Sequence, residues 1–352
     1  MVGKSVECFK HEAGRMTKTF LKSLIMRKMS RSRSSATAGF TLLELLIVSL
    51  ISGLLISGLM YLVVELLTVD QRESSRTETQ RDMQMALDYM STELKEAVFV
   101  YSGACMAGTA SGCKALATSL PTLFTATSTP VLAFWKQQPI PNALRLAQCA
   151  AGTQTLGGRS VPCTAGSSYS LVVYSLVLNT PNPPSPWKGK ARITRYALTE
   201  FNSAGTARTA GYGRDVTPSG AWQAIPPLAG ITPDVLVDFV DDNVGATTVI
   251  GAANPTCPDD PTTTSFIEYL PSPVIAAAPT TVIPAARSFF ACVKDTTTLS
   301  NSYRDVVLFL RGSVSGRPGF RDADRAFLPA LEARVLTRGV LGREPASSTG
   351  AP

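Results

Sequence analysis

Residues 39–64, GFTLLELLIVSLISGLLISGLMYLVV, decide the fold of this 352-residue chain. From Phe40 to Val64 the only charged side chain is Glu44, and there is no proline. At about 1.5 Å per residue, a helix of this length crosses the roughly 30 Å hydrocarbon core of a bilayer. The sequence therefore predicts a transmembrane helix over residues 40–64.

A basic, serine-rich segment, residues 1–39, precedes the apolar run and ends in glycine. In a secretory signal peptide the small-residue cleavage site follows the apolar stretch, so that the stretch is discarded. Here the small residue stands in front of it. A cut between Gly39 and Phe40 would therefore remove the leader and leave the helix on the mature protein.

The charge of the leader supports this interpretation. Residues 1–39 hold nine Lys or Arg and two acidic residues, and removing them from the 33 basic and 26 acidic residues of the chain leaves 24 of each. The mature chain is then neutral, so the basic balance gives no indication of nucleic-acid binding. By the positive-inside rule the leader lies on the cytoplasmic face and the C-terminal part is exported.

Residues 65–99 are predicted to continue the same helix as an amphipathic segment. No proline occurs before Pro121, and good helix formers dominate. A linker would be rich in Gly, Ser or Pro instead. Apolar residues recur at spacings of three and four, which marks one stripe that a globular domain would cover: Met83, Leu87, Met90, Leu94 and Val98.

Residues 100–352 are predicted to form one exported β-rich domain. Short runs with Val, Ile, Phe and Tyr are bounded by Pro, Gly or Asn, as strands are. No helix-length crossover separates them, which favours an antiparallel sheet. The predicted strands are 131–135, 169–178, 192–201, 235–240, 287–293, 305–310 and 333–341.

Six cysteines remain after the leader is removed, and an even number in an exported domain predicts disulfides. Six cysteines allow 15 pairings, and we favour the neighbouring pairs, which are separated by 8, 14 and 35 residues. These are Cys105 with Cys113, Cys149 with Cys163, and Cys257 with Cys292. A zinc site through sulfur is the alternative, but there is no C-x-x-C spacing and the mature chain has no histidine.

The only histidine, His11, lies in the leader. Ser-His-Asp and Cys-His catalysis are therefore excluded for the mature chain, and no Walker-type loop or GxGxxG fingerprint occurs. Carboxylate-pair chemistry stays open, because any two acids can meet in space. We predict no enzyme activity and no cofactor.

Three carboxylates and an amide form the densest oxygen cluster and are a weak candidate for calcium: Asp238, Asp241, Asp242 and Asn243. Their spacing does not match an EF-hand loop. A solvated turn at a strand end is the favoured interpretation, and no metal site is predicted.

The order Gly39-Phe40-Thr41-Leu42-Leu43-Glu44 before a membrane-length apolar run resembles the type IV prepilins and the type II secretion pseudopilins. The resemblance implies that prepilin peptidase cuts after Gly39 and methylates the amine of Phe40. It also implies that Glu44 meets the amino terminus of a neighbouring subunit during assembly. A carboxylate in a span costs about 2.5–3.5 kcal/mol on insertion scales, so a partner is expected. The alternatives are an ordinary single-pass anchor and an interfacial carboxylate without a role.

The size of the chain and its downstream sequence resemble large minor pilins of the PilW type and J-type pseudopilins. The likeness is greatest to the hormogonium polysaccharide secretion pseudopilins. It rests on the helix end at 80–97 and on four further segments: VLAFWKQQP (131–139), SLVVYSL (170–176), GKARITRYALTEF (189–201) and LEARVLTRGVL (331–341). The implied fold is an α+β, pilin-like one, in which a long N-terminal helix packs on an antiparallel sheet with long disulfide-stapled loops.

The implied function is that of a minor pilin or pseudopilin in a filament that supports polysaccharide secretion and gliding motility. The implied partners are prepilin peptidase, other pilins or pseudopilins, an inner-membrane assembly platform and membrane lipid, with exported polysaccharide as a further candidate. The protein would be a single-pass inner-membrane protein with an exported C-terminal domain, assembled in a filament. The alternative is a membrane-anchored exported enzyme or glycan-binding protein, which would have a flexible linker after the span and a cleft of convergent polar groups.

Overall fold

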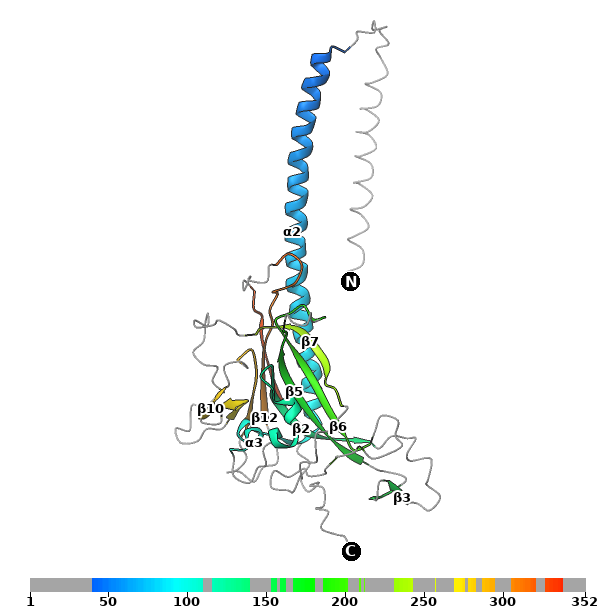
Figure 1. Cartoon of the computed structure of the whole chain (residues 1–352), viewed down its shortest axis with the longest axis vertical. Coiled ribbons are helices and arrows are strands. Elements are labelled where there is room, and N and C mark those ends of the chain that lie inside the picture. Colours follow the sequence, from blue (N-terminus) through cyan, green and yellow to red (C-terminus); the bar gives the residue numbers. More distant parts are fainter. Residues whose placement is uncertain are drawn as a thin grey trace, which may run out of the picture. The chain divides into compact units, whose positions relative to one another are not determined.

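The computed structural model describes residues 40–109, 116–139, 153–156, 159–162, 167–180, 186–201, 209, 212, 231–242, 257, 269–275, 278–282, 287–294, 305–320 and 327–337. In these residues one long N-terminal helix is followed by antiparallel sheets, an α+β arrangement (Figure 1). The chain divides into two compact units, Met1–Glu65 and Leu66–Pro352. The leader, residues 1–39, lies outside the described residues.

Helix α2, Leu42–Lys95, runs through both the apolar segment and its polar continuation. In the first unit its side chains are exposed, and this part is long and apolar enough to cross a membrane by length and composition. In the second unit one face becomes buried. The buried residues include the predicted stripe positions Met83, Leu87, Met90 and Leu94, and the stripe extends back to Ser75.

The helix ends at Lys95, not at residue 99 as predicted. Residues Ala97–Val100 form strand β1, and Val98 of the predicted stripe lies in it. Val98, Phe99 and Val100 are β-branched or aromatic, and β1 pairs with β2 (Ser128–Pro139), with Val100 opposite Phe134. Cross-strand pairing therefore overrides the helical periodicity at this end.

Five strands form the first sheet, in the order β1-β2-β5-β6-β7, and all neighbours are antiparallel. Its other strands are β5 (Ser167–Leu178), β6 (Ala191–Thr199) and β7 (Asp234–Val240). β2 and β5 pair along their whole length, from Ser128 opposite Val177 to Pro139 opposite Ser167. β1 and β7 are the edge strands of this sheet in the described part of the chain.

A second antiparallel sheet has the order β13-β12-β11-β8. Its strands are β8 (Tyr269–Ser272), β11 (Phe289–Lys294), β12 (Asp305–Arg311) and β13 (Ala330–Leu336). Two small hairpins join β3 (Thr153–Leu156) to β4 (Arg159–Pro162) and β9 (Val274–Ile275) to β10 (Ala278–Val282). Short helices α3 (Gly103–Ala107), α4 (Leu116–Ser119) and η1 (Pro121–Leu123) follow β1.

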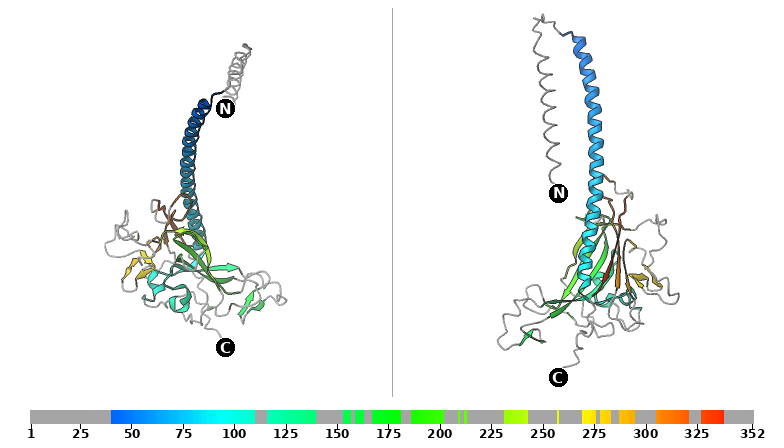
Figure 2. Two further views of the ribbon diagram at one scale, coloured as in Figure 1. Left: turned by 45° about the horizontal axis from the view of Figure 1, so that its top comes forward. Right: turned by 180° about the vertical axis from the view of Figure 1, so that it is seen from behind.

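The core is shared by the helix and both sheets (Figure 2). Met83, Met90 and Leu94 of α2 belong to one buried cluster with residues such as Phe134 and Phe289 from the two sheets. The sheets also meet directly at one corner: Val240 bridges to Gly312, and Ser313 N–H donates to the Phe239 carbonyl at 2.7 Å. The sheets and residues 75–94 of the helix therefore share one core.

The seven predicted strands are all present with shifted ends. β2, β5 and β7 begin earlier than predicted, while β6 ends at Thr199 and β13 at Leu336. Residues 338–341, the end of the last predicted strand, lie outside the described residues. The prediction missed β1 and the short strands β3, β4, β8, β9 and β10, which are mostly four residues or fewer and carry little periodic signal.

Candidate functional site

The predicted cleavage and assembly motif lies at the start of α2. Gly39 lies outside the described residues, and Phe40 and Thr41 precede the helix. Thr41 acts as the N-cap, because its Oγ1 accepts a hydrogen bond from Glu44 N–H at 3.3 Å. Its carbonyl accepts from Leu45 N–H at 3.2 Å. Phe40, the first residue after the predicted cut, is therefore exposed and outside the hydrogen-bonded helix.

Thr41 was not among the predicted site residues, although its spacing identifies it. Thr41-x-x-Glu44 before an apolar run has the spacing of a capping box, a helix-start signal that can be read from sequence. Glu44 occupies the first turn, where the helix dipole favours a negative charge. Its carboxylate has no partner in the described part of the chain.

A second glutamate, Glu93, lies near the other end of α2 and is buried against the first sheet. Arg195 of β6 donates to both carboxylate oxygens, from Nε at 2.9 Å and from Nη2 at 2.7 Å. Lys136 of β2 lies 2.8 Å away through Nζ, and the Tyr174 hydroxyl of β5 also donates. Tyr174 and Arg195 are directly opposite each other across β5 and β6, so strand register places both donors under the helix.

The contacts around Glu93 shift the pKa values of Glu93, Tyr174 and Arg195. Burial by itself would raise the pKa of Glu93, but the hydrogen bonds from Arg195, Lys136 and Tyr174 outweigh it and lower the pKa to about 2. Burial and the neighbouring carboxylate raise the pKa of Tyr174. The hydrogen bond to Glu93 raises the pKa of Arg195. Glu93 is thus a fixed anion that anchors the helix to three strands.

Sequence reasoning missed Glu93, although a signal was present. Glu93 stands three residues after Met90 and next to Leu94, so it lies on the buried stripe of α2. A charge on a buried stripe needs a partner. The partners themselves, which are separated from Glu93 by 102 residues in the case of Arg195, could not be read from spacing.

A buried arginine, Arg317, holds the helix about three to four turns before Glu93. It follows β12 and pairs with Glu78 at 2.6 Å and with Asp82, both on α2. Its guanidinium also lies 4.1 Å from the centroid of the Phe239 ring, at the end of β7. Two carbonyls of the same loop accept from the helix: Pro318 O from Ser75 Oγ at 2.8 Å, and Gly319 O from Arg72 Nε at 3.1 Å.

Gly312 permits the close approach of this loop to the helix. A Cβ at this position would lie 2.9 Å from Met83 Cγ and 3.1 Å from Thr79 Cγ2. Gly319 has a φ of +81°, a conformation that glycine adopts without strain, and an added Cβ would lie 3.0 Å from Arg72 Cγ. Residues 312–320, which we call the Arg317 loop, therefore fit the helix through both charge and shape.

Two carboxylates of the weak calcium candidate, Asp238 and Asp241, have named protein partners. Asp238 Oδ2 accepts from the N–H groups of Lys188 and Gly189 at 2.9 and 3.0 Å. Asp241 Oδ2 pairs with Arg311 at 2.6 Å. Asn243 lies outside the described residues. In the described ranges, no group of three or more His, Cys, Asp or Glu is arranged to hold a metal ion.

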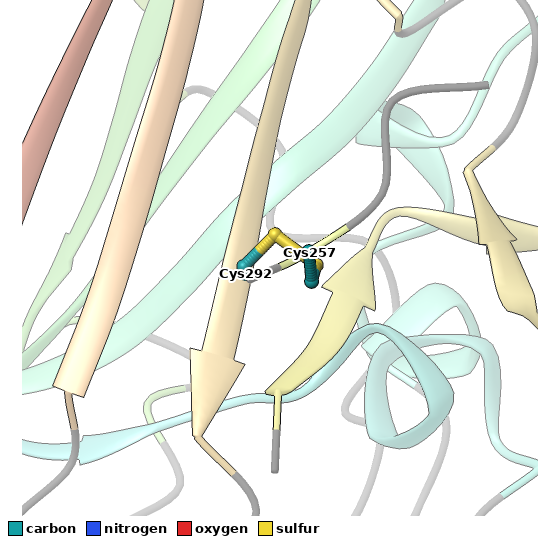
Figure 3. The surroundings of a disulfide bond; sticks show 2 residues. All are labelled: Cys257 and Cys292. Atoms are coloured by element: carbon teal, nitrogen blue, oxygen red, sulfur yellow. A yellow bond between two sulfur atoms is a disulfide. The ribbon is translucent and has the colours of Figure 1, made fainter. Parts of the chain in front are cut away.

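One of the three predicted disulfides is present in the described ranges. Cys257 bonds to Cys292 of β11, with a Cα–Cα distance of 5.6 Å (Figure 3). Cys105 is also disulfide-bonded. Cys113, Cys149 and Cys163 lie outside the described residues, so the pairings 105–113 and 149–163 stay predictions.

Comparison with protein-family models, with curated proteins and with solved structures finds no match to this chain. The roles of its charged residues are therefore argued from their contacts alone. Glu93 and Arg317 make ion pairs and hydrogen bonds that hold the helix to the sheets. Glu44 and Phe40 lie in the first unit, where their side chains are exposed.

Proposed function

We propose that this protein is a minor pilin or pseudopilin, a subunit that joins an inner-membrane-rooted filament through its N-terminal helix. One observation carries the proposal: α2 runs without a break from Leu42 to Lys95. Its first part is apolar and exposed, and its second part is buried against two sheets from Ser75 onwards. A single helix that is both membrane anchor and domain core suits a subunit that assembles through its helix.

In this proposal prepilin peptidase removes residues 1–39 and methylates the amine of Phe40. The exposed position of Phe40 before the helix supports processing, because proteases act on chain that is not locked in a helix. Glu44 then neutralises the amino terminus of a neighbouring subunit in the low-dielectric membrane. The lack of a partner for its carboxylate among the described residues supports that role.

The proposed support of polysaccharide secretion and gliding motility rests on the resemblance alone. The four segments that carry the resemblance correspond largely to β2, β5, β6 and β13. β2, β5 and β6 are interior strands of the first sheet and β13 is an edge strand of the second, so the likeness concerns the scaffold of the domain. The proposed partners are the peptidase, other pilins or pseudopilins, the assembly platform and membrane lipid.

The alternative, a membrane-anchored enzyme or glycan-binding protein, is less well supported. It expects a flexible linker between the anchor and the domain, rich in Gly, Ser or Pro. Residues 65–82 are instead helical throughout. No observation on the described residues favours this alternative over a filament subunit.

Mass spectrometry of the mature N-terminus tests processing. We expect the protein to begin at Phe40 with a methylated amine, and Gly39→Leu to leave an unprocessed form in the inner membrane. An intact leader on assembled protein would refute the proposal.

Glu44→Val tests assembly. The substitution removes an insertion cost of about 2.5–3.5 kcal/mol, so poor membrane entry could not explain a defect. We expect processed protein in the membrane but reduced recovery in sheared filaments. The matched control is Ser49→Val, which removes a polar side chain that bonds only to its own helix. Normal filament incorporation of Glu44→Val would show that the carboxylate has no assembly role.

A further inference from the structure

We propose that a groove between α2 and the edge strand β7 docks an extended, basic segment of another polypeptide. The groove has a volume of about 440 Å³. It lies wholly within the second unit, so the inference does not depend on processing or on the filament. Its lining residues are Asp82, Met85, Ala86 and Tyr89 of α2 and Leu236, Val237 and Asp238 of β7.

Exposed apolar side chains gather in this groove. Beyond Val69, the exposed large apolar residues in the described ranges are Met85, Tyr89, Trp187 and Leu336, and the first two both line the groove. Met85 is 52% exposed and Tyr89 is 46% exposed. They stand four residues apart on one helix face, and methionine and aromatic residues are enriched at protein interfaces.

The strand side of the groove favours an extended partner. β7 is the last strand of its sheet among the described residues, and an edge strand presents N–H and C=O groups to which another strand can add. The end of β7 is already used, because the Phe239 carbonyl accepts from Ser313 N–H and Asp241 N–H donates to the Arg311 carbonyl. Among the described residues, the stretch from residue 234 to residue 238 has no strand partner on its outer side.

The charge of the groove specifies a basic partner. Asp82 and Asp238 are its only charged lining residues. Arg317 fixes Asp82 through Oδ2, while Oδ1 has no partner in the described part of the chain and the side chain is 29% exposed. Asp238 is held by Asn179 Nδ2 and by two backbone N–H groups. A Lys or Arg of the partner can donate to Asp82 Oδ1, and the negative charge of Asp238 adds to the attraction.

The same charge argues against a second copy of this chain. A twofold contact places the same surface on both partners. The acidic groove would then face itself, and like charges in contact are unfavourable. The occupant is therefore a different polypeptide, with a Lys or Arg flanked by apolar residues.

Photo-crosslinking in cells that make the full-length protein tests the proposal. Benzoyl-phenylalanine is placed at Met85, at Tyr89, or at the control position Gln84, which is exposed on α2 but does not line the groove. We expect positions 85 and 89 to capture the same foreign peptide, containing Lys or Arg, and position 84 not to capture it. No crosslink, a crosslink to a second copy, to lipid or to glycan, or equal capture at position 84 would overturn the proposal.

Two substitutions of opposite charge at Met85, each made with the photoprobe at position 89, test whether charge selects the partner. Met85→Lys and Met85→Glu both replace an exposed side chain, so both proteins should fold, and circular dichroism checks this. We expect the Lys variant to give about tenfold less crosslink than the Glu variant. Asp88→Lys, which adds positive charge outside the groove, should leave the yield unchanged. Equal yields from the two Met85 variants would show that charge does not select the partner.

Discussion

The two parts of helix α2 belong to one element but have opposite surroundings. Residues 42–64 are apolar apart from Glu44 and a few small polar residues, and their side chains are exposed. Residues 66–95 are rich in charge, yet one face of them is buried from Ser75 onwards. An apolar exposed helix is stable where lipid surrounds it, whereas a charged helix is stable where a protein core covers one face. The two parts of α2 therefore suit different surroundings although the helix is continuous.

The two glutamates make the same comparison at the level of single residues. Glu93 has three donors within its own domain, from Arg195, Lys136 and Tyr174. Glu44 has none for its carboxylate in the described ranges. Glu93 is buried and its partners tie it into its own fold, whereas Glu44 is exposed and takes no part in the buried core. Substitutions at the two positions should therefore affect different properties, stability at Glu93 and assembly at Glu44.

The largest expected effect on stability is that of Glu93→Gln. The neutral amide cannot balance the positive charges of Arg195 and Lys136. Removing one partner of a buried ion pair costs about 3–5 kcal/mol in the free energy of unfolding. That is a large part of the roughly 5–15 kcal/mol that stabilises a domain. Urea unfolding of the full-length protein in detergent, followed by tryptophan fluorescence, measures the change. Glu44→Gln, by contrast, should leave the unfolding midpoint unchanged.

Glu96→Gln is the matched control. Glu96 directly follows the end of α2, is 57% exposed in its side chain and pairs with the same Lys136 at 3.4 Å. An exposed pair contributes about 0–1 kcal/mol. If Glu93→Gln costs no more than this control, the carboxylate is not an anchor of the helix.

Acid should weaken the same contact. The pKa of Glu93 is about 2 in the folded protein, against an ordinary value of 4.5. Because the folded-state pKa is lowered, the stabilisation is complete above about pH 5 and is lost as the pH falls towards 2. Wild type should therefore lose more stability than Glu93→Gln between these pH values. Urea titrations at each pH measure the free energy of unfolding of both proteins. If it falls by the same amount in wild type and in Glu93→Gln, the assigned pKa is wrong.

Arg317→Met should have an intermediate effect. It removes a buried cation from Glu78 and Asp82, but the Glu78 side chain is 60% exposed and can be hydrated instead. We expect a loss of about 1–3 kcal/mol in the free energy of unfolding. Hydrogen exchange should rise in residues 72–82 and not in residues 90–95, because the Glu93 contacts remain. The control, Arg76→Met, removes only weak contacts to two Phe rings and Glu73 and should cost less.

The sequence predicts those parts of the molecule that depend on periodicity and composition. The helix from Leu42, the stripe through Met83 and Leu94, and the main strands follow from local patterns. The contacts of Arg317 do not, because Asp82 lies 235 residues away and no spacing rule relates the two positions. The predicted end of the helix at residue 99 was also wrong. Residues 97–100 form a strand instead, and the pairing of Val100 with Phe134 depends on a strand more than thirty residues further on. The groove beside β7 requires the sheet order, which the sequence did not provide.

The smallest expected effect is that of Thr41→Ala, which tests whether the start of the apolar part has a structure of its own. The substitution removes the side-chain oxygen that accepts from Glu44 N–H, while the Thr41 carbonyl still accepts from the same N–H at 3.0 Å. The loss of such a side-chain cap costs about 1 kcal/mol. The first turn should then fray, and amide exchange of the first-turn N–H groups, measured in lipid nanodiscs, should rise about fivefold.

Thr41→Ser keeps the hydroxyl and should exchange like wild type, because serine caps helices at least as well as threonine. Ser49→Ala removes a hydroxyl that donates to the Leu46 carbonyl within the helix, so it should not change exchange in the first turn. None of the three variants should alter urea unfolding of the sheet domain, since residues 40–65 contribute no side chain to its buried core. Unchanged exchange in Thr41→Ala would show that Thr41 does not fix the helix start. A lower unfolding midpoint in the same variant would show instead that the two parts of α2 are energetically coupled, and the contrast between them would then no longer hold.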